Sequence, residues 1–435
     1  MRQLIIQIGA EIRIKDPTPQ LKKWCDENLV LRNPEYDDRM RRGLWTGKTP
    51  EYLWLFRGDG QELVVPTGTG KEIRKFLTEQ DLIEIHLADQ AHVQYDGELP
   101  LYDYQRPAVA AMKEQSCGIL QAPCGSGKTQ MGIALAAELS GKTLWVTHTQ
   151  DLLNQSYERA AQYFPKSTLG KITAGKVMIG SHMTFATAQT LCKLDLSRYE
   201  YVWDTVIVDE CHRLAGTQVT MFYKILNSLA ARHKYGLSAT VHRSDGMIRS
   251  TFAVLGPVVY RVPDEAVADK TMKVQICERS TGVKVNRCVL DTDGTLEYSK
   301  LIPYLINCSE RNDQIVKDLK DNAEHFNLVL SDRLEHLKNL MDLLPEDLRM
   351  QAVMIDGKMQ SKSGRLAREK AIENMRNGKK HFLFASYGLA KEGLDIPRLD
   401  RLYLVTPKIM RWSPSLSAGS RGPSMENRTQ SALTM

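Results

Sequence analysis

A glycine-rich segment that ends in lysine and threonine is the first feature of this sequence that could carry chemistry. It runs from Ala122 to Thr129, with the sequence APCGSGKT, between a short apolar run and a helical pattern. Small residues let backbone N–H groups close on phosphate oxygens, and the first turn of a helix adds a favourable dipole. Ala122 replaces the first glycine of the strict phosphate-loop pattern. The residues that we expect to bind nucleotide here are Pro123, Cys124, Gly125, Ser126, Gly127, Lys128 and Thr129.

Lys128 and Thr129 have different expected roles, and both need a partner elsewhere in the chain. Lys128 would neutralise the β and γ phosphates, and the Thr129 hydroxyl would coordinate Mg²⁺. Asp209 and Glu210, which follow an apolar run typical of a strand, could complete this site. Asp209 would hold Mg²⁺, and Glu210 would orient and deprotonate the attacking water. The two motifs together predict nucleotide hydrolysis, whereas either alone is common by chance.

A second glycine-rich segment, PTGTGKE, runs from Pro66 to Glu72. It places the carboxylate of Glu72 where a metal-binding hydroxyl is needed, beside phosphates that this carboxylate would repel. We therefore expect a turn between a strand at 62–65 and a helix, and no second phosphate site.

Strand and helix patterns alternate around the predicted phosphate loop. This alternation predicts a parallel sheet with helices on both faces, and such sheets bind ligands at the carboxyl ends of their strands. Between residues 118 and 240 we expect strands at 118–120, 143–147, 177–179, 205–208 and 235–237, and helices at 128–139, 152–164 and 220–231.

The same alternation returns between residues 326 and 406, so we expect two α/β units in tandem after a small α+β accessory domain. In the second unit the expected strands are 327–330, 353–355, 382–385 and 402–405, and the expected helices are 334–344 and 363–375. The predicted domains are 1–97 (accessory), 98–262 (first α/β unit), 263–322 (connector and entry to the second unit), 323–408 (second α/β unit, incomplete) and 409–435 (an aberrant, disordered tail).

Composition excludes several classes of protein. The eight cysteines form no CxxC pair, which argues against a zinc knuckle or a disulfide framework. The net charge of +6 is unevenly distributed, because residues 1–100 carry 14 Lys and Arg against 17 Asp and Glu. The longer basic remainder is compatible with a polyanionic partner. No apolar run could span a membrane and residues 1–10 carry no cleavage site, so we expect a cytoplasmic protein.

The segment from Asp209 to His212 (DECH), followed by Ser238-Ala-Thr240, resembles motifs II and III of superfamily 2 helicases of the DEAD/DEAH-like (DECH-box) kind. With residues 34–36 and 45–50, the pattern most resembles phage-encoded DNA helicases near the XPB-like branch. Other segments resemble further motifs of the family: 101–109 the upstream glutamine motif, 146–152 motif Ia, 180–185 motif Ib, 328–336 motif IV and 385–397 motif V.

The resemblance implies two RecA-like P-loop NTPase domains that close on ATP and Mg²⁺ and grip nucleic acid in turn. Gln105 would read the adenine edge, with Tyr104 beside it, and His212 would join the catalytic group. The remaining residues that it implies are Ser238 and Thr240 for coupling, Thr149, Ser181, Thr184 and Ser386 for nucleic-acid phosphates, and Gly393 and Asp395 for the nucleotide. The expected partner is nucleic acid, DNA rather than RNA, with no membrane, for a monomer in a bacterial or phage-infected cytoplasm.

The family's motif VI, a Gln followed by Gly-Arg and a further Arg, is missing after Lys408. Plausible codons read one base earlier from Lys408 would restore it, so we expect a frameshifted, truncated chain. An arginine that reaches the γ-phosphate across the cleft is worth about 10³- to 10⁵-fold in rate. ATP binding should then persist in part while turnover is badly impaired.

Alternatives remain open at several points. An ATP-responsive nucleic-acid-binding module with little turnover competes with a motor, and a restriction-enzyme motor subunit is disfavoured because no nuclease pattern is evident. His212 could be a polar residue with a structural role, and 238–240 a strand-end turn. The basic residues Lys362, Arg365, Arg368 and Lys370 suit a solvated helix face. We expect Trp24, Trp45 and Trp54 to be core residues more than base-stacking platforms.

Overall fold

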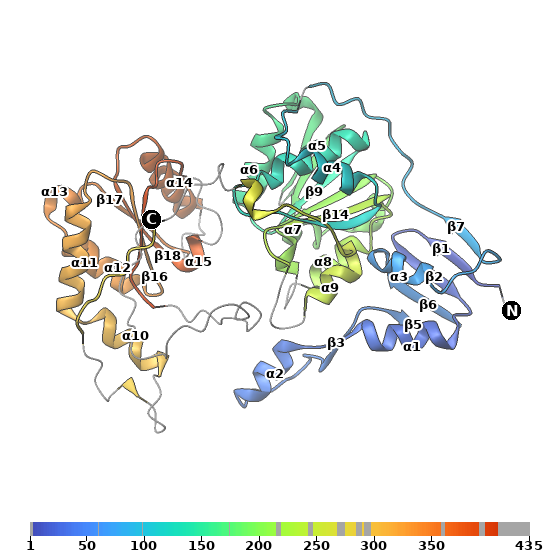
Figure 1. The fold of residues 1–435 in the computed structure, drawn as a ribbon, viewed down its shortest axis with the longest axis horizontal. Coiled ribbons are helices and arrows are strands. Elements are labelled where there is room, and N and C mark those ends of the chain that lie inside the picture. Colours follow the sequence, from blue (N-terminus) through green and yellow to red (C-terminus); the bar gives the residue numbers. More distant parts are fainter. Residues whose placement is uncertain are drawn as a thin grey trace. The chain divides into compact units, whose positions relative to one another are not determined.

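The computed structural model divides the chain into two compact units, residues 1–272 and 273–435 (Figure 1). Within the described residues, no helix combines the length and apolar character needed to cross a bilayer. The residues that the structure describes are 3–59, 61–97, 99–173, 175–214, 219–241, 247–267, 275–283, 289–290, 297–357, 362–390 and 396–407.

A five-stranded mixed sheet opens the first unit, in the order β5-β6-β2-β1-β7. Helix α1 packs on it through Leu21 and Cys25, and the Thr18 side chain caps its first turn by accepting from the Leu21 N–H. A separate two-stranded sheet pairs β3 with β4. The elements are β1 (Ile5–Ile8), β2 (Glu11–Lys15), α1 (Pro19–Asn28), β3 (Val30–Arg32), α2 (Pro34–Arg41), β4 (Tyr52–Trp54), β5 (Arg57–Gly58), β6 (Glu62–Pro66), α3 (Gly70–Arg74) and β7 (Leu82–Ile85).

The predicted parallel sheet forms the centre of the first unit, with the strand order β11-β10-β12-β9-β13-β14-β8-β15. All neighbours pair in parallel except β10 and β11. The strands are β8 (Cys117–Gln121), β9 (Thr143–Thr147), β10 (Leu169–Thr173), β11 (Lys176–Met178), β12 (Met183–Thr187), β13 (Thr205–Asp209), β14 (His233–Ser238) and β15 (Val258–Arg261).

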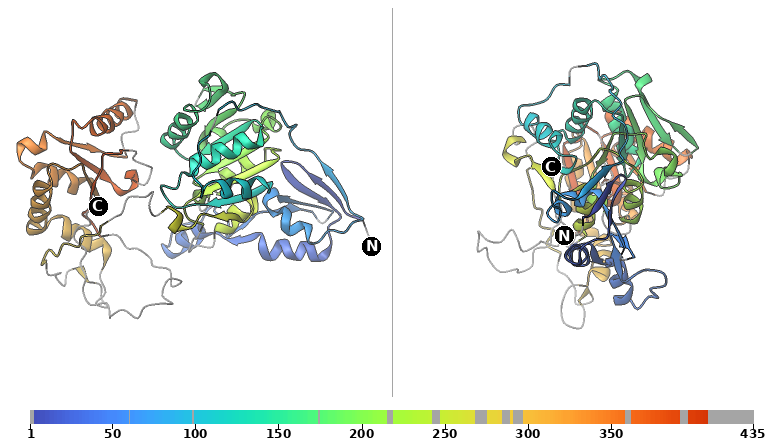
Figure 2. Two further views of the ribbon diagram at one scale, coloured as in Figure 1. Left: turned by 45° about the horizontal axis from the view of Figure 1, so that its top comes forward. Right: turned by 90° about the vertical axis from the view of Figure 1, so that its right-hand side faces the viewer.

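Helices cover both faces of this sheet (Figures 1 and 2). One apolar cluster joins α4, α5 and α6 to one face, and a second joins α7, α8 and α9 to the other. Because both faces are buried, the strands are nearly continuous runs of apolar residues, as parallel strands usually are. The helices are α4 (Arg106–Lys113), α5 (Lys128–Leu139), α6 (Gln150–Ala160), α7 (Ala188–Leu191), α8 (Val219–Leu226) and α9 (Ile248–Leu255).

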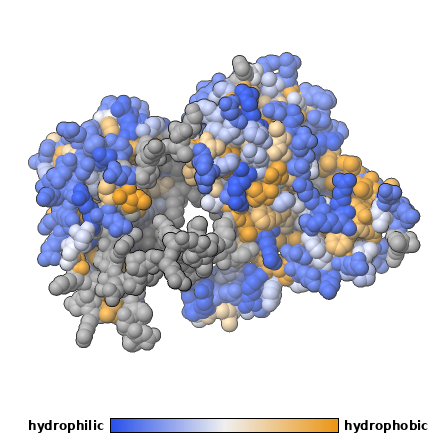
Figure 3. All heavy atoms as spheres, viewed as in Figure 1, coloured by the Kyte–Doolittle hydropathy of each residue, from blue (hydrophilic) through white to orange (hydrophobic). Residues whose placement is uncertain are grey.

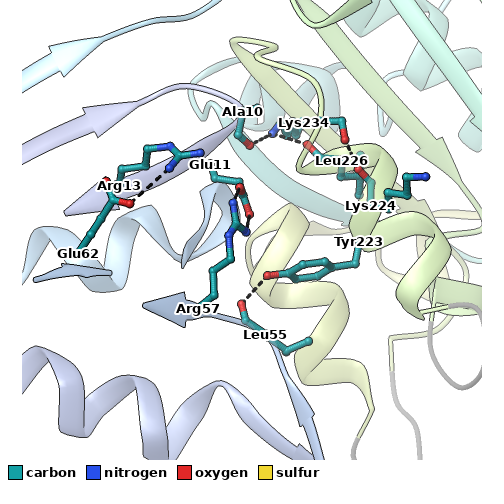
Figure 4. A network of polar contacts seen from close by, with 11 residues as sticks. Ala10, Glu11, Arg13, Leu55, Arg57, Glu62, Tyr223, Lys224, Leu226 and Lys234 are labelled. Carbon is teal, nitrogen blue, oxygen red and sulfur yellow. Dashed lines mark hydrogen bonds and ion pairs between the residues drawn. The ribbon is translucent and has the colours of Figure 1, made fainter. Parts of the chain in front are cut away.

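The amino-terminal sheet is docked on this central sheet through a buried lysine (Figure 4). Lys234, on β14, is fully buried, and its Nζ donates to the carbonyls of Ala10 (2.8 Å) and Leu226 (2.7 Å). Burial lowers the pKa of Lys234 to about 8. Beside it, the Tyr223 hydroxyl donates to the Leu55 carbonyl at 2.7 Å. The two sheets of the first unit are therefore joined by directional bonds as well as by apolar packing.

The second unit has a four-stranded parallel sheet in the order β17-β18-β16-β19. Helices α11 and α12 pack on one face and α14 and α15 on the other. The elements are α10 (Tyr298–Ile306), α11 (Ser309–Asp321), β16 (Asn327–Ser331), α12 (Leu334–Asp342), α13 (Glu346–Arg349), β17 (Ala352–Ile355), α14 (Lys362–Arg376), β18 (Phe382–Ser386), α15 (Tyr387–Ala390) and β19 (Arg401–Leu404).

A buried histidine links α12 to its neighbours in the second unit. The ring of His336 lies 3.2 Å from the Ser331 hydroxyl and 3.0 Å from the Asn312 carboxamide oxygen. Burial, with a smaller contribution from nearby Arg311, lowers the pKa of His336 to about 3. The ring is therefore neutral at physiological pH, and its two nitrogens serve as structural hydrogen-bonding groups.

The predicted fold class, two α/β parallel-sheet units in tandem after an α+β portion, is confirmed. The proposed connector is more regular than expected, because it contains α10 and α11; Pro303 lies inside α10 and obscures its helical pattern in the sequence. The expectation of core tryptophans is wrong for two of the three. Trp24 packs against Phe76, but Trp45 and Trp54 are 85% and 61% exposed. The predicted tail, 409–435, lies outside the described residues.

Candidate nucleotide and nucleic-acid site

The carboxyl ends of the parallel strands of the first unit form one edge of the sheet, and the predicted motifs meet there. The phosphate loop follows β8, Asp209 ends β13 and Ser238 ends β14. The registers β8–β14 and β14–β13 place these three ends side by side. Parallel topology alone therefore gathers residues that are far apart in the sequence.

The phosphate loop has the backbone shape that its glycines permit. Gly125 and Gly127 have φ of +79° and +78°, in the left-handed region, and α5 begins directly afterwards at Lys128. The Lys128 Nζ lies 3.4 Å from the Ala122 carbonyl oxygen and 3.9 Å from Glu210 Oε1. The lysine thus lies across the loop, with its ammonium near the acidic motif.

Two side chains from the upstream glutamine motif form hydrogen bonds to the backbone of the phosphate loop. The Tyr104 hydroxyl and the Gln105 carboxamide both donate to the Ser126 carbonyl, at 3.0 and 2.8 Å. The Gln105 Oε1 accepts from the Tyr102 N–H at 3.0 Å, and the side chain is only 2% exposed. A Cβ on Gly127 would lie 2.5 Å from Gln105 Nε2, so this position requires glycine. Gln105 therefore positions the loop through one of its two N–H donors and one lone pair of its oxygen, and its predicted adenine contact stays a prediction.

Asp209 and Glu210 form the acidic part of the site. Asp209 is 5% exposed, and its Oδ1 accepts from the Glu210 N–H at 3.0 Å. Burial and the neighbouring Glu210 raise the pKa of Asp209 to about 6, against a smaller lowering by Lys128. Glu210 has φ of +50°, a conformation that costs a residue with a side chain about 1–3 kcal/mol. Such strain is concentrated at functional sites.

A chain of polar contacts connects the acidic motif to the end of β14. The His212 Nδ1 lies 3.2 Å from Glu210 Oε2 and 3.0 Å from the Ser238 hydroxyl. Ser238 in turn donates to the Thr240 carbonyl at 2.6 Å and accepts from the Thr240 N–H at 3.2 Å. The structure therefore brings the predicted catalytic residues Glu210 and His212 into contact with the predicted coupling residues.

The residues at this edge suit a nucleoside triphosphate with Mg²⁺. The Thr129 hydroxyl and the Asp209 carboxylate are oxygen ligands, the kind that Mg²⁺ takes together with substrate phosphates. The buried Ser126 hydroxyl has no hydrogen-bond partner within the described residues, and the space beside Gly127 admits no side chain. Among those same residues, no group of three or more His, Cys, Asp or Glu could bind a metal without such a substrate.

The predicted nucleic-acid residues of the first unit lie at opposite edges of the sheet. Thr149 follows the carboxyl end of β9 and caps α6, accepting from the Leu152 N–H at 3.3 Å. Ser181 precedes β12, where His182 lies beside Thr143 at the amino ends of the strands. Ser181 therefore lies on the edge away from the nucleotide motifs, and the prediction that it and Thr149 line one surface does not fit this topology.

Thr184 is also displaced from its predicted role. It is fully buried, and its hydroxyl accepts from the Gly180 N–H (3.1 Å) and from the Trp203 indole (3.3 Å). The hydroxyl therefore fixes the start of β12 and is not available to a phosphate. The segment 180–185, to which motif Ib was assigned, therefore comprises the turn before β12 and the first residues of that strand.

Sequence reasoning missed the residues that follow β12 at the nucleotide edge. Thr187 caps α7, and the exposed Gln189 donates through Nε2 to the His148 carbonyl at 2.8 Å. This bond ties the first turn of α7, directly after β12, to the loop after β9 that carries Thr149. The change from the buried residues of β12 to the more polar sequence ATAQT at 186–190 could have indicated these residues.

In the second unit, Ser386 ends β18 at the carboxyl edge of its own sheet, and its phosphate contact stays a prediction. Gly393 and Asp395 lie outside the described residues. The second glycine-rich segment forms the predicted turn between β6 and α3. Its Gly68 lies against the end of α9, where an added Cβ would be 2.4 Å from the Gly256 nitrogen. That glycine therefore allows two backbones to pack closely.

The family described as the res subunit of type III restriction enzymes matches residues 98–243, which hold the phosphate loop and the DECH motif. The "Putative ATP-dependent RNA helicase L396" of Acanthamoeba polyphaga mimivirus is 27% identical over 69% of this chain and 56% of its own length. The DNA 3'-5' translocase XPB2 of Sulfurisphaera tokodaii is 28% identical over 46% of this chain and 45% of its own.

Among solved structures, T4 UvsW aligns with 93% of this chain and 84% of its own at 18% identity, with a TM-score of 0.44. The chain spans about half the length of the two curated relatives just described.

Proposed function

We propose that this chain, which belongs to the superfamily 2 helicases related to viral and XPB-like enzymes, uses ATP hydrolysis to move along or unwind nucleic acid. The observation that carries the proposal is the continuous set of contacts from Lys128 through Glu210 and His212 to Ser238. This set joins the proposed phosphate-binding lysine, Lys128, and the candidate base, Glu210, to the predicted coupling residue Ser238 at the end of β14.

Each residue of this set has a role that its geometry supports. Lys128 would bind the β and γ phosphates, and Thr129 and Asp209 would hold Mg²⁺, which supplies charge neutralisation for phosphoryl transfer. Glu210 would orient the attacking water and take its proton. Because His212 contacts both Glu210 and Ser238, a change at the γ-phosphate would alter the loop that follows β14.

For nucleic acid we propose the carboxyl-edge loops of both units. Thr149 and residues 187–190, at the start of α7, would contact phosphates from the first unit, and Ser386 from the second. Such contacts hold the backbone without reading its sequence. DNA is the substrate that we favour, because the XPB2 relative is a DNA translocase; the mimivirus relative is named for RNA, so both belong in the test.

ATP hydrolysis measured with single-stranded, duplex and forked DNA and with RNA tests the proposal. Glu210→Gln should lower turnover about 10²- to 10⁴-fold while ATP still binds, because it removes the base. Lys128→Ala should lose nucleotide affinity as well. Lys71→Ala, in the second glycine-rich segment, is the matched control and should be neutral. Turnover that survives both Lys128→Ala and Glu210→Gln would refute this site.

A second candidate is an ATP-responsive nucleic-acid-binding module with little turnover. Residues 409–435 carry no motif VI pattern, and the nucleotide arginine of that motif is worth about 10³- to 10⁵-fold in rate. A single-turnover measurement with and without DNA separates the two. ATP-dependent DNA affinity with a negligible rate supports the module, and a rate stimulated by DNA into the usual range of about 1 s⁻¹ or more supports the motor.

A further inference from the structure

An arm formed by residues 33–51 projects from the amino-terminal part of the first unit, between β3 and β4 (Figure 1). Its tip, residues 39–48, has the sequence RMRRGLWTGK, with four cationic and no acidic residues. Trp45 at this tip is 85% exposed, more than any other large apolar side chain in the described part of the chain. The arm's visible surface is otherwise mostly hydrophilic (Figure 3).

The tip has a defined shape that presents the indole. Helix α2 ends with Gly43 at φ +63°, the Gly43 N–H bonded to the Met40 carbonyl and the Leu44 N–H to the Arg39 carbonyl. Gly47 has φ +54°, and a Cβ there would lie 3.0 Å from the Trp45 ring. The indole thus lies against the backbone on one side, and most of its surface stays open to solvent.

The root of the arm fixes the position of the tip. The Arg32 guanidinium lies 5.4 Å from the Tyr36 ring and 5.2 Å from the Tyr52 ring, and it pairs with Asp37 and Glu51. The Asn33 carboxamide donates to the Pro50 carbonyl at 2.7 Å, which closes the arm at its base. An arm held in this way can present a side chain without first having to order itself on binding.

The cations beside Trp45 can exchange their partners. Arg41 and Arg42 pair with Asp38 at 3.8 and 3.0 Å, but their side chains are 71% and 67% exposed. Exposed pairs of this kind contribute little, so a phosphate can replace the carboxylate at small cost. An exposed aromatic ring among cations is the combination that binds single-stranded nucleic acid, with the base on the ring and phosphates on the cations.

We propose that Trp45 stacks on an unpaired base of the nucleic-acid substrate while Arg41, Arg42 and Lys48 contact the adjacent phosphates. The inference rests on the proposed function, because it gives the same motor a contact for unpaired strands outside its two sheets. A protein partner fits less well, because the cores of protein interfaces are depleted of charge, whereas the tip that carries this ring has four cationic and no acidic residues.

The test is equilibrium binding of fluorescein-labelled oligonucleotides of about 16 nucleotides, without ATP, followed by fluorescence anisotropy. Trp45→Ala should weaken binding of single strands about 5- to 150-fold, the equivalent of one base–aromatic stack, and leave blunt duplex within about twofold. Trp45→Phe should retain most of the affinity. Tyr201→Ala is the matched control, since Tyr201 is 55% exposed on the same unit beside Glu200.

A second readout locates the contact. Oligonucleotides with 5-iodouracil at one unpaired position should crosslink to Trp45 on irradiation, as mapped by mass spectrometry. Equal affinities of Trp45→Ala and wild type would overturn the proposal, as would equal losses on single strands and blunt duplex. A dimer that depends on Trp45 in sedimentation experiments would also overturn it, in favour of a second copy as the partner.

The outcomes distinguish this proposal from the proposed function. If wild type binds the oligonucleotides and Lys128→Ala abolishes ATP turnover, but Trp45→Ala changes nothing, only the arm's role fails. If wild type binds no nucleic acid, both proposals fail. Because Trp45 is so exposed, its variants should keep the thermal midpoint of wild type, which circular dichroism checks.

Discussion

At the scale of single residues, Gln105 has a position that the sequence did not predict. Its carboxamide bonds the loop at Ser126 on one side and the backbone of Tyr102 on the other. A residue that reads adenine must offer free donors and acceptors, whereas one that supports a loop uses them internally. The structure favours a role for Gln105 in supporting the phosphate loop, and a measurement can distinguish this role from adenine recognition.

Gln105→Ala should therefore destabilise the protein by about 1–3 kcal/mol, because it removes buried hydrogen bonds. It should weaken ATP and GTP binding alike, since the loop contacts only phosphates. Chemical denaturation and nucleotide titration check this. Selective loss of ATP over GTP at unchanged stability would restore the predicted role in adenine recognition.

Gln189 and Ser181 provide a paired test of which edge of the sheet faces nucleic acid. Gln189→Ala should raise the DNA concentration needed for half-maximal ATPase stimulation about three- to tenfold, because it frees the loop that carries Thr149 at a cost of about 1 kcal/mol. Ser181→Ala, at the other edge, should be neutral. The opposite pattern would return the interface to the amino ends of the strands.

Much of the site could be predicted from the sequence, because its motifs are short and contiguous. Local pattern alone placed Lys128 at the start of a helix and Asp209 at the end of a strand, and the resemblance to motif III identified Ser238. Ser181 and Thr184 could not be placed correctly, because the sequence pattern predicted no strand at β12, which runs from Met183 to Thr187. A shift of a few residues along a strand moves a side chain from one edge of a sheet to the other. The bonds of Gln105 depend on tertiary contacts that no local pattern encodes.

At the scale of elements, β14 serves two sites. Its carboxyl end carries Ser238 of the nucleotide site, and Lys234 near its amino end holds the Ala10 carbonyl of the amino-terminal sheet. Two backbone carbonyls, of Ala10 and Leu226, accept from the Lys234 Nζ. The lowered pKa of Lys234, to about 8, is the consequence of this burial.

Comparison of wild type with Lys234→Met should reveal the titration of this lysine as a pH dependence of the free energy of unfolding. Between about pH 8 and pH 10.4 the unfolded chain keeps the Lys234 proton while the folded chain releases it. The unfolded state then binds more protons, so the free energy of unfolding of wild type should rise relative to the variant, by at most about 1.4 kcal/mol per pH unit. Urea denaturation of both proteins across this range checks the slope. A constant difference would mean that Lys234 titrates normally.

The sequence predicts some helices and strands more accurately than others. Helix α5 and strand β9 have the predicted bounds, because each is a continuous apolar pattern ended by a clear signal such as Ser140. Strands β10, β12 and β15 were missed: β10 (LGKIT) and β12 (MTFAT) interrupt their apolar residues with Gly, Lys or Thr, and β15 has four residues at the edge of the sheet. Helix α10 was missed because of its internal proline.

At the scale of the whole molecule, the chain consists of two compact units, each with its own core. The alternation of strands and helices predicted both sheets. The exposed arm was not predicted, because composition alone cannot separate a buried tryptophan from one at the end of a two-stranded ribbon.

The two units should respond separately to acid. Neutral His336 contributes stability above its unfolded pKa of about 6.5, and this is lost as pH falls toward its folded pKa of about 3. Lowering the pH from about 7 to about 5 should therefore lower the stability of the second unit. His336→Gln should remove the part of this pH dependence that comes from the histidine. Hydrogen exchange resolved by mass spectrometry assigns the change to β16–β19. If acid lowered the protection of strands β8–β14 equally, and His336→Gln removed this effect too, the two units would unfold together.

The buried end of Lys234 also limits how this protein can be rearranged. The amino-terminal sheet cannot be exchanged as a cassette for that of a relative unless the graft supplies a carbonyl where Ala10 stands and room for the backbone at Gly68. A chimera without them would leave an unsolvated amine inside the protein, whereas Lys234→Met in the recipient would make it tolerant of foreign partners. Lys234 and the backbone contact at Gly68 therefore decide together whether the amino-terminal sheet is modular.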